Sequence, residues 1–317
     1  MSEPVVECVP NFSEGTDLRR VQAIVAAMHV PGVNLLDWSM DADHNRSVVT
    51  IAGAPGAIVE AAVRGAGKAV ELLDLTRQQG VHPRIGAADA IPFVPISGIK
   101  LEQCVLLARQ AGLEIWRRYG VPVFFYEAAA ARPDRANLED IRRGQFEGLR
   151  DAVRNDSSRR PDLGGPGLHP TAGACAVGAR KFMVEYNICF DTSDVAIARA
   201  IAREVRTASS GLKGVKALGL LTHGRAQLTM NITDFEVTPL SQVFRKVSDL
   251  ALRHKVAPVS GAIVGLLPEA ACERESDWMH QLSEFDPQTK LLEHRLAAPL
   301  AWPGEASSVV RTLDPPR

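Results

Sequence analysis

The sequence predicts a protein of the α/β (α+β) class, built from two related lobes that each follow the order β-α-β-β-α-β. Short apolar runs that end at turn residues indicate strands, and apolar residues three or four positions apart indicate amphipathic helices. The 317 residues approach the limit of one hydrophobic core, so two domains are expected. A segment dense in glycine and proline, 156–178, separates the two series of elements.

The first half starts with an apolar run that ends at Pro10, which predicts a buried strand. Thr16 is the expected N-cap of the first helix. A later strand contains Pro92 and Pro95, which places it towards a sheet edge, because proline cannot donate to a β-ladder. The expected elements are strand 5–9, helix 17–28, strands 33–38 and 47–52, helix 58–73, strand 91–96, helix 101–118 and strand 121–126.

The second half repeats this order without a visible repeat of individual residues. The expected elements are strand 180–190, helix 194–208, strands 215–221 and 227–234 joined by a turn, helix 240–254 and strand 259–264. This is the split βαβ arrangement. The first half shows the same order extended by one helix and one strand, so two α+β lobes are expected.

Composition excludes several classes of function. A formal net charge of −1 provides no general positive field for nucleic acid or anionic lipid. The five cysteines are widely spaced, odd in number and without a C-x-x-C pair, which indicates free thiols in a reducing compartment. The N-terminus does not look like a secretory signal, and no stretch of about 18 apolar residues predicts a membrane span. We therefore expect a cytoplasmic protein.

A loop between an expected helix and an expected strand carries His82. Histidine titrates near neutrality and is the usual proton-transfer group. Pro83 restricts the backbone at this position, Gly86 permits unusual dihedral angles, and Arg84 and Asp89 add a cation and an acid nearby. From the residues alone, a catalytic role and a surface position both remain open.

The polar segment around His44 has three interpretations. Asp41, Asp43 and His44 could be metal ligands, although no further cluster with ligand spacing accompanies them. They could equally provide ordinary turn chemistry together with Asn45. Arg46, just before a strand, could bind a substrate carboxylate.

Other motifs indicate structure rather than chemistry. The sequence Gly65-Ala66-Gly67-Lys68 lies in a helical pattern and lacks the spacing of a phosphate loop. No G-x-G-x-x-G motif opens the first helix, so a nicotinamide cofactor is not supported. Basic pairs such as Arg142-Arg143 are expected on solvated faces. The glycine-rich segment is either a linker or an ordered loop that approaches a flat ligand.

Several ordered blocks closely resemble the formiminotransferase domain of the glutamate formiminotransferase family. The similarity runs from about residue 7 to about residue 300. The blocks are ECVPNFSEG (7–15), NRSV (45–48), HPRIGA (82–87), GARKF (178–182), NI (187–188), NITDFEVT (231–238) and VGLLP (264–268).

The resemblance implies a fold and an assembly. The family has two ferredoxin-like βαββαβ-type subdomains with mixed sheets facing each other, helices outside and folate in a tunnel between them. The subdomains would span residues 1–179 and 180–300, followed by a C-terminal tail, 301–317. The resemblance also implies a homodimer. Multifunctional relatives continue into a cyclodeaminase domain, so here a separate cyclodeaminase is expected to act downstream.

The resemblance also implies roles for individual residues. His82 matches the catalytic histidine. Some family members have a D-x-D pair where this chain has Asp37 and Ser39, so Asp41 is the expected assisting carboxylate. The expected substrate-binding residues are Asn11, Asn45, Arg46 and Arg84, with both arginines as candidates for the glutamate carboxylates. The expected folate-binding loop consists of Leu163, Gly164, Gly165, Pro166, Gly167, Leu168, His169, Pro170, Thr171 and Ala172.

The implied reaction moves a formimino group from N-formimino-L-glutamate to N5 of tetrahydrofolate, giving 5-formimidoyltetrahydrofolate and L-glutamate, within histidine degradation and one-carbon metabolism. Tetrahydrofolate would be the co-substrate, with no metal and no nicotinamide, and neither nucleic acid nor a membrane would be a partner. One alternative is a glutamate formyltransferase that uses N-formyl-glutamate or 5-formyltetrahydrofolate. The other is a folate-binding protein without catalysis.

Overall fold

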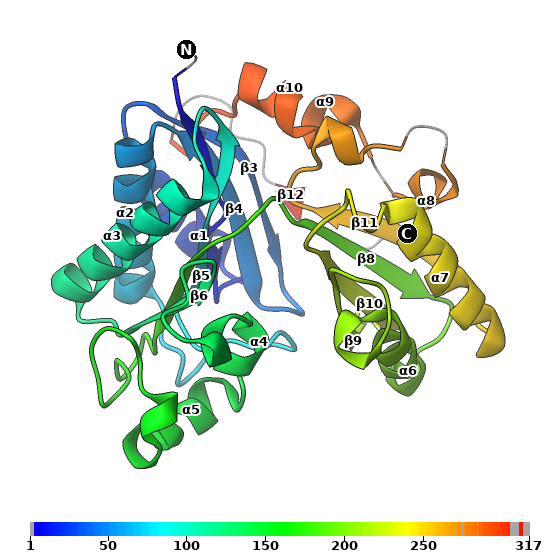
Figure 1. The fold of residues 1–317 in the computed structure, drawn as a ribbon, viewed down its shortest axis with the longest axis horizontal. Coiled ribbons are helices and arrows are strands. Elements are labelled where there is room, and N and C mark those ends of the chain that lie inside the picture. Colours follow the sequence, from blue (N-terminus) through cyan, green and yellow to red (C-terminus); the bar gives the residue numbers. More distant parts are fainter. Residues whose placement is uncertain (1–2, 274–275, 284, 305–310, 313–317) are drawn as a thin grey trace. The chain divides into compact units, whose positions relative to one another are not determined.

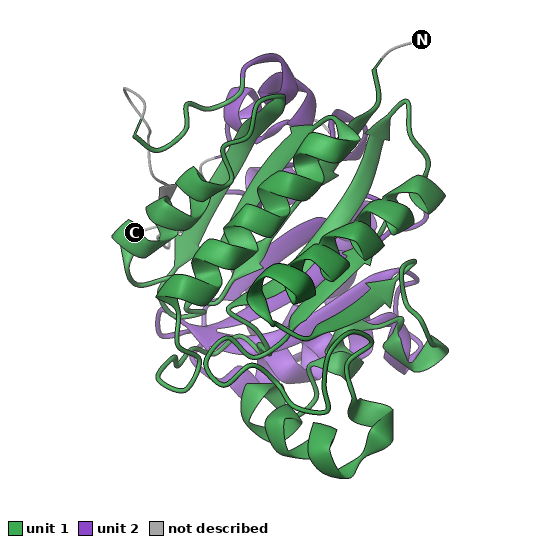
Figure 2. Ribbon diagram, turned by 90° about the vertical axis from the view of Figure 1, so that its left-hand side faces the viewer, with its two compact units in different colours: residues 1–180, 299–313 green, residues 181–298, 314–317 purple. Residues whose placement is uncertain are grey.

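The chain forms two compact units, shown in Figures 1 and 2. Unit 1 holds residues 1–180 and 299–313, and unit 2 holds residues 181–298 and 314–317. The structure is a computed structural model that describes residues 3–273, 276–283, 285–304 and 311–312.

Unit 1 is built on a mixed sheet. Its elements are β1 (Val5–Cys8), β2 (Asn11–Phe12), α1 (Leu18–Ala27), β3 (Val33–Asp41), β4 (Arg46–Gly53), α2 (Pro55–Leu72), β5 (Ala88–Ser97), α3 (Leu101–Tyr119), β6 (Val123–Glu127), α4 (Leu138–Ile141), α5 (Gln145–Asn155), β7 (Cys175–Ala179) and β12 (Arg311–Thr312). The strand order is β12-β3-β4-β1-β5-β7-β6, and β2 pairs with β4 and β5. Within it, β3-β4-β1-β5 is the expected ferredoxin-like order, and the expected extension by α3 and β6 is also present.

The helices α1, α2 and α3 cover one face of this sheet (Figure 2). Val6 and Cys8 of β1 point towards them and belong to the main hydrophobic core. Successive side chains of a strand alternate between faces, so Glu7 belongs to the opposite face. Asp37 and Ser39 of β3 are also buried outside this core, between its members Leu35, Trp38 and Met40. The sheet therefore has an apolar face under the helices and a face that carries acids and hydroxyls.

The prediction that β5 is an edge strand was wrong. It pairs with β1 on one side and β7 on the other. Pro95 is tolerated because the β7 ladder ends at Phe93, and a register shift adjoins the Val6–Pro95 pair. A proline without an N–H can therefore sit in an interior strand at a bulge and beyond the end of a neighbouring ladder.

Two further details of unit 1 differ from the sequence-based expectations. Asp17, not Thr16, caps α1, since its Oδ1 accepts from the backbone N–H of Arg19 at 2.9 Å, while the Thr16 hydroxyl donates to Glu14. The strand β7 lies in the segment expected to be a loop. It is parallel to β5 and β6 and buried on both faces, so the alternation that marks a half-buried strand is missing.

The chain returns to unit 1 near its C-terminus. The backbone N–H of Leu300 donates to Leu35 O at 2.7 Å, and β12 runs parallel to β3. Within the expected tail 301–317, residues 305–310 and 313–317 lie outside the described residues.

Unit 2 repeats the same topology in a smaller form. Its elements are β8 (Val184–Phe190), α6 (Val195–Val205), β9 (Val215–Thr222), β10 (Arg225–Ile232), α7 (Leu240–Arg253), β11 (Pro258–Val264), α8 (Asp277–His280), α9 (Pro287–Lys290) and α10 (Leu292–Ala297). The order β11-β8-β10-β9 confirms the βαββαβ prediction. Every pairing in this sheet is antiparallel, so the expectation of a mixed sheet was wrong here. The His223-Gly224 turn between β9 and β10 has two positive φ angles.

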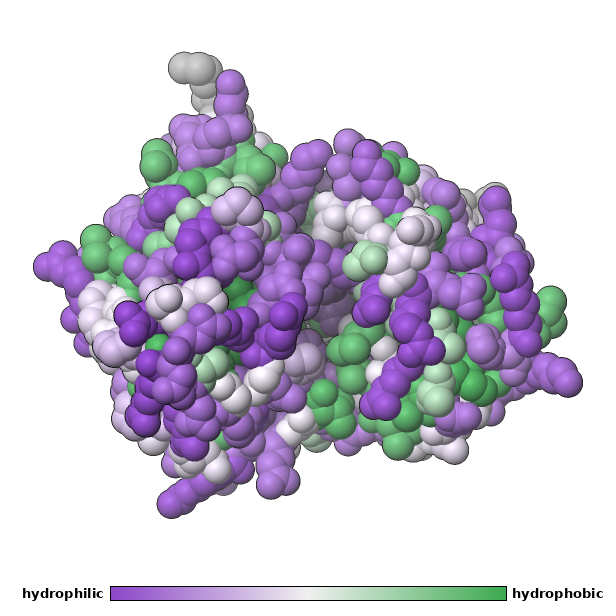
Figure 3. Space-filling view, turned by 60° about the horizontal axis from the view of Figure 1, so that its bottom comes forward, coloured by the Kyte–Doolittle hydropathy of each residue, from purple (hydrophilic) through white to green (hydrophobic). Residues whose placement is uncertain are grey.

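The surface shown in Figure 3 is largely hydrophilic, with apolar side chains in small groups. Within the described part of the chain, no helix combines the length and apolar character needed to cross a membrane. All five cysteines are free thiols, three of them buried.

Candidate active site

His82 lies on the connection between α2 and β5 in unit 1, and hydrogen bonds from three directions hold this loop. The Ser13 hydroxyl donates to Gly86 O at 2.7 Å, and the backbone N–H of Ala87 donates to Ala172 O at 2.9 Å. From α5, the N–H of Phe146 donates to Arg84 O at 2.9 Å. The loop is therefore fastened to neighbouring segments of unit 1 and is not a free surface loop.

Gly86 is required by space and not, as expected, by an unusual dihedral angle. Positive φ angles occur elsewhere, for example at Gly173, while Gly86 is not among them. A Cβ atom at Gly86 would lie 2.0 Å from the Ala174 carbonyl oxygen. This close approach lets Gly86 pair with Gly173 and fixes the backbone next to His82.

The His82 imidazole is held in one tautomer. Its Nδ1 lies 2.8 Å from the Pro83 carbonyl oxygen. Since a carbonyl oxygen only accepts, Nδ1 carries the proton in the neutral ring, and Nε2 carries the lone pair. The ring is partly buried, with its basic nitrogen on the side away from this hydrogen bond.

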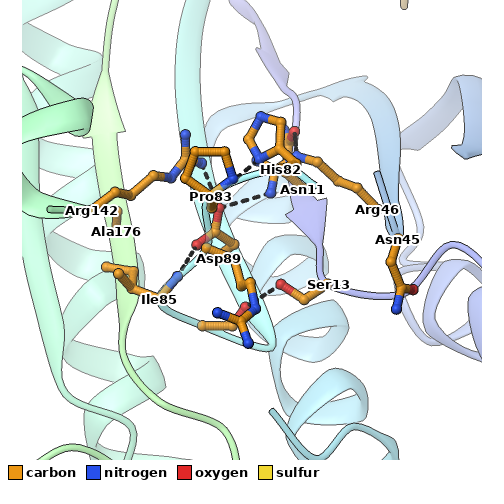
Figure 4. Close-up of polar contacts among 12 residues, drawn as sticks. Asn11, Ser13, Asn45, Arg46, His82, Pro83, Ile85, Asp89, Arg142 and Ala176 are labelled. Atoms are coloured by element: carbon orange, nitrogen blue, oxygen red, sulfur yellow. Dashed lines mark hydrogen bonds and ion pairs between the residues drawn. The ribbon is translucent and has the colours of Figure 1, made fainter. Parts of the chain in front are cut away.

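A buried ionic cluster lies beside His82 (Figure 4). Asp89 is fully buried at the start of β5 and accepts from Arg46 Nη1 at 2.8 Å, from Arg142 Nη2 and from the Ile85 N–H at 2.7 Å. Figure 4 shows the two arginines reaching Asp89 from opposite sides, with His82 between them. A buried carboxylate is stable in such a place only when it is paired and hydrogen-bonded.

These charges set the protonation states of the site. Burial alone would raise the pKa of Asp89, but Arg142, Arg46 and the Ile85 amide outweigh it and hold that pKa well below its usual range. Burial and the same two arginines lower the pKa of His82 well below its ordinary value, and Asp89 offsets this only in part. The site therefore contains an ionised Asp89 and a neutral His82 near pH 7.

Asn11 and Arg46 belong to this cluster. Arg46 begins β4 and its Nε donates to Asn11 Oδ1 at 3.0 Å, while Asn11 Nδ2 donates to Val9 O at 2.8 Å. Asn11 pairs in register with Val48 of β4, so both side chains reach the site from adjacent strands. The structure thus brings three of the expected site residues together: His82, Asn11 and Arg46.

Arg84 is directed into the protein. Its Nη1 and Nη2 bind the Glu147 carboxylate at 2.8 and 2.7 Å, its Nε donates to Gln78 Oε1, and the remaining hydrogen bonds go to Gln145 and Gln78 O. All five N–H donors are therefore used by protein oxygens. This arrangement favours a structural role for Arg84, which holds the loop in place, and it speaks against the expected binding of a substrate carboxylate.

Asp41 and Asn45 act within the β3–β4 turn. Asp41 Oδ1 accepts from the His44 N–H at 2.8 Å and lies 3.0 Å from His44 Nδ1. The His44 ring stands edge-on to His82, with centroids 6.2 Å apart. Asn45 accepts from the Gly15 N–H and donates to Gln79 O. Asp41 is thus linked to His82 by way of His44, and turn chemistry is confirmed for this segment.

The expected folate loop, 163–172, lies in unit 1 and reaches the His82 loop at one end. Leu163 O accepts from the Val123 N–H at the start of β6, whereas Ala172 is bonded to Ala87. His169 Nδ1 accepts from the Ala172 N–H at 3.0 Å and closes the turn. Burial lowers the pKa of His169, in keeping with this acceptor role.

The metal interpretation of Asp41, Asp43 and His44 gains no support. Within residues 3–273, 276–283, 285–304 and 311–312, no group of three or more histidine, cysteine or acidic side chains is arranged to hold a metal ion.

Comparison with known families decides the relationship of this chain. The model of the formiminotransferase domain's N-terminal subdomain matches residues 5–180, and the formiminotransferase domain model matches residues 185–281. The chain belongs to the formiminotransferase family. Because named members of the family are transferases, the chain is a transferase.

Relatives in the family span bacteria, archaea and animals. The glutamate formimidoyltransferase of Streptococcus pyogenes serotype M1 is 41% identical over 295 residues, covering 92% of this chain and 98% of that protein. The glutamate formimidoyltransferase of Thermoplasma acidophilum is also 41% identical, covering 92% and 97%. The formimidoyltransferase-cyclodeaminase of Mus musculus is 34% identical and matches 92% of this chain but 59% of that longer protein.

Two residues of the ionic cluster beside His82 were not assigned from the sequence. Asp89 was noted only as an acid near His82, although a charged residue within an apolar strand pattern was a usable signal. Arg142 was expected on a solvated face, which was wrong, since it pairs with Asp89, while its neighbour Arg143 is exposed. No local pattern distinguishes the two arginines, because the decisive contact joins residues 53 positions apart.

Proposed function

We propose that this member of the formiminotransferase family transfers the formimino group of N-formimino-L-glutamate to N5 of tetrahydrofolate, giving 5-formimidoyltetrahydrofolate and L-glutamate. The observation that carries the proposal is the neutral His82 imidazole, whose Nδ1–H is fixed by Pro83 O. Its Nε2 lone pair provides a base, and the cationic groups beside it suit a formimino donor that carries carboxylates.

The reaction requires one proton to change places. N5 of tetrahydrofolate attacks the amidine carbon, and a tetrahedral intermediate forms. His82 Nε2 accepts the proton from N5 and then donates it to the glutamate nitrogen, whose bond to carbon breaks. A lowered pKa makes the protonated imidazole a strong acid, so it passes the proton on readily. Holding both substrates in one site supplies the entropic part of the acceleration.

We assign the binding of a substrate carboxylate to Arg46. Its guanidinium is directed by Asn11 and Asp89, and both partners are anchored in strands. A planar guanidinium recognises carboxylates well. Asp41 orients His44 next to the imidazole, and that is the assisting role we assign to it.

We assign tetrahydrofolate binding to the loop 163–172, because its end at Ala172 is hydrogen-bonded to the His82 loop at Ala87. Tetrahydrofolate is a co-substrate in this scheme, and neither a metal nor a nicotinamide takes part. The homodimer, the separate cyclodeaminase and the cytoplasmic location stay predictions.

Replacing His82 with alanine tests the proposal. Transfer should fall by about 10²–10⁴, the usual range for general acid–base catalysis, while tetrahydrofolate still binds. The exposed His280 of unit 2, replaced with alanine, is the matched control and should leave transfer unchanged. Near-normal turnover by a folded His82→Ala protein would refute the role of this imidazole.

The two alternatives predict different assay results. Faster transfer from N-formyl-glutamate than from N-formimino-L-glutamate would favour the formyltransferase. Binding of tetrahydrofolate without turnover of either donor would favour a binding protein.

A further inference from the structure

Arg142 reaches the site from a part of unit 1 distant in sequence. It directly follows α4, and its side chain is 13% exposed. Its Nη2 donates to Asp89 Oδ2, the same oxygen that accepts from Arg46. In Figure 4 it approaches Asp89 from the side opposite to Arg46, next to His82. Two guanidinium groups therefore face one buried carboxylate.

The Arg142 guanidinium is only partly engaged by the protein. Its Nε is buried and has no hydrogen-bond partner, in contrast to Arg84, whose five donors are all used. In the described part of the chain, Arg142 forms its ion pair with Asp89, and Asp89 also pairs with Arg46. A buried donor without a partner costs about 1–3 kcal/mol, so a further anion at this guanidinium would find a favourable partner.

The position of Arg142 is also fixed relative to His82. Glu147, five residues later, binds Arg84 through both carboxylate oxygens, and the Phe146 N–H donates to Arg84 O. Arg84 is two residues from His82, so the segment carrying Arg142 and the loop carrying the imidazole are fastened together. A binding group held in this way is preorganised for its ligand.

We propose that Arg142 binds the α-carboxylate of the formimino donor. This inference rests on the proposed function, in which His82 donates a proton to the glutamate nitrogen. The α-carboxylate is carried by the carbon bonded to that nitrogen, so it must lie close to the imidazole. Arg142 then takes the role that the sequence suggested for Arg84.

The test combines a variant with a truncated donor. N-formimino-4-aminobutyrate lacks the α-carboxylate and keeps the other one. With the unaltered protein, kcat/KM should be about 10- to 100-fold lower for this donor, the range for hydrogen bonds to charged groups. Arg142→Ala should show the same loss with N-formimino-L-glutamate, mainly through KM, and no further loss with the truncated donor. The KM for tetrahydrofolate should not change.

Arg143→Ala is the matched control, because Arg143 is the neighbouring residue, is 76% exposed at its side chain and pairs with Asp140. It should leave both donors unaffected. If Arg142→Ala does not fold, Arg142→Lys keeps a charge near Asp89, and a loss confined to N-formimino-L-glutamate supports the proposal.

Equal losses with both donors in the Arg142 variants would overturn the inference, since Arg142 would then act only by holding the loop. An unaltered protein that transfers nothing from N-formimino-L-glutamate would instead overturn the proposed function, so the two failures are distinguishable.

Discussion

Replacing Asp89 with asparagine removes the carboxylate shared by Arg46 and Arg142 while keeping the size of the side chain. The amide oxygen can still accept from the Ile85 N–H, so the change is mainly one of charge. Asp89 is fully buried, and both arginines are nearly so. Breaking a buried ion pair by removing one partner costs about 3–5 kcal/mol, because the remaining charge is left without compensation. We expect a loss of this size in the free energy of unfolding.

Urea unfolding followed by tryptophan fluorescence measures this loss. Trp38, Trp116 and Trp302 belong to unit 1 and Trp278 to unit 2, so the signal mainly reports the unit that contains Asp89. With a slope of about 2 kcal/mol per molar urea, the midpoint should fall by roughly 2 M.

Asp140→Asn is the control for the Asp89 variant, because Asp140 pairs with an exposed arginine on the surface, and its effect should stay within about 0.5 kcal/mol. If Asp89→Asn lowers the free energy of unfolding by less than about 1 kcal/mol, Asp89 does not compensate the charges of Arg46 and Arg142 in a buried site.

The dependence of this effect on pH follows from the lowered pKa of Asp89. A depressed carboxyl pKa contributes stability above the unfolded value of about 3.9, and this contribution is lost as the pH falls below that value. The difference between the two proteins should therefore be constant near neutrality and shrink below about pH 4. A difference that grows on acidification would contradict the assignment.

Three further outcomes are expected. The lowered pKa of His82 keeps the imidazole neutral, so the acid limb of the pH profile of kcat/KM should have its midpoint below pH 6.5. A midpoint at or above pH 6.5 would argue against a neutral base among guanidinium groups. Arg84→Ala should lower kcat about 10-fold with little change in donor KM, and Glu147→Ala should do the same because it removes the same contact. A rise in donor KM alone would instead support the binding of a substrate carboxylate by Arg84. Tetrahydrofolate should slow hydrogen exchange in the loop 163–172, most strongly at its end beside the His82 loop, and unchanged exchange under saturation would count against this loop.

Local patterns in the sequence predicted most helices and strands, and they failed where a partner strand determined the outcome. β5 became an interior strand despite Pro95, because bulged pairing with β1 and a short β7 ladder accommodate this proline. β7 itself was missed, since burial on both faces leaves no alternation to detect.

The sequence by itself determined the family, the βαββαβ order of both units and the histidine loop, because these depend on periodicity and on residues close together in the chain. The tertiary structure decided the partners of the charged groups. The residues around Arg84 and Arg142 in the sequence do not predict different roles for them. In the structure, protein oxygens accept from all N–H donors of Arg84, whereas Arg142 shares a buried carboxylate beside His82. The free energy of a buried charge depends on groups dozens of residues away, and only folding brings those groups into contact.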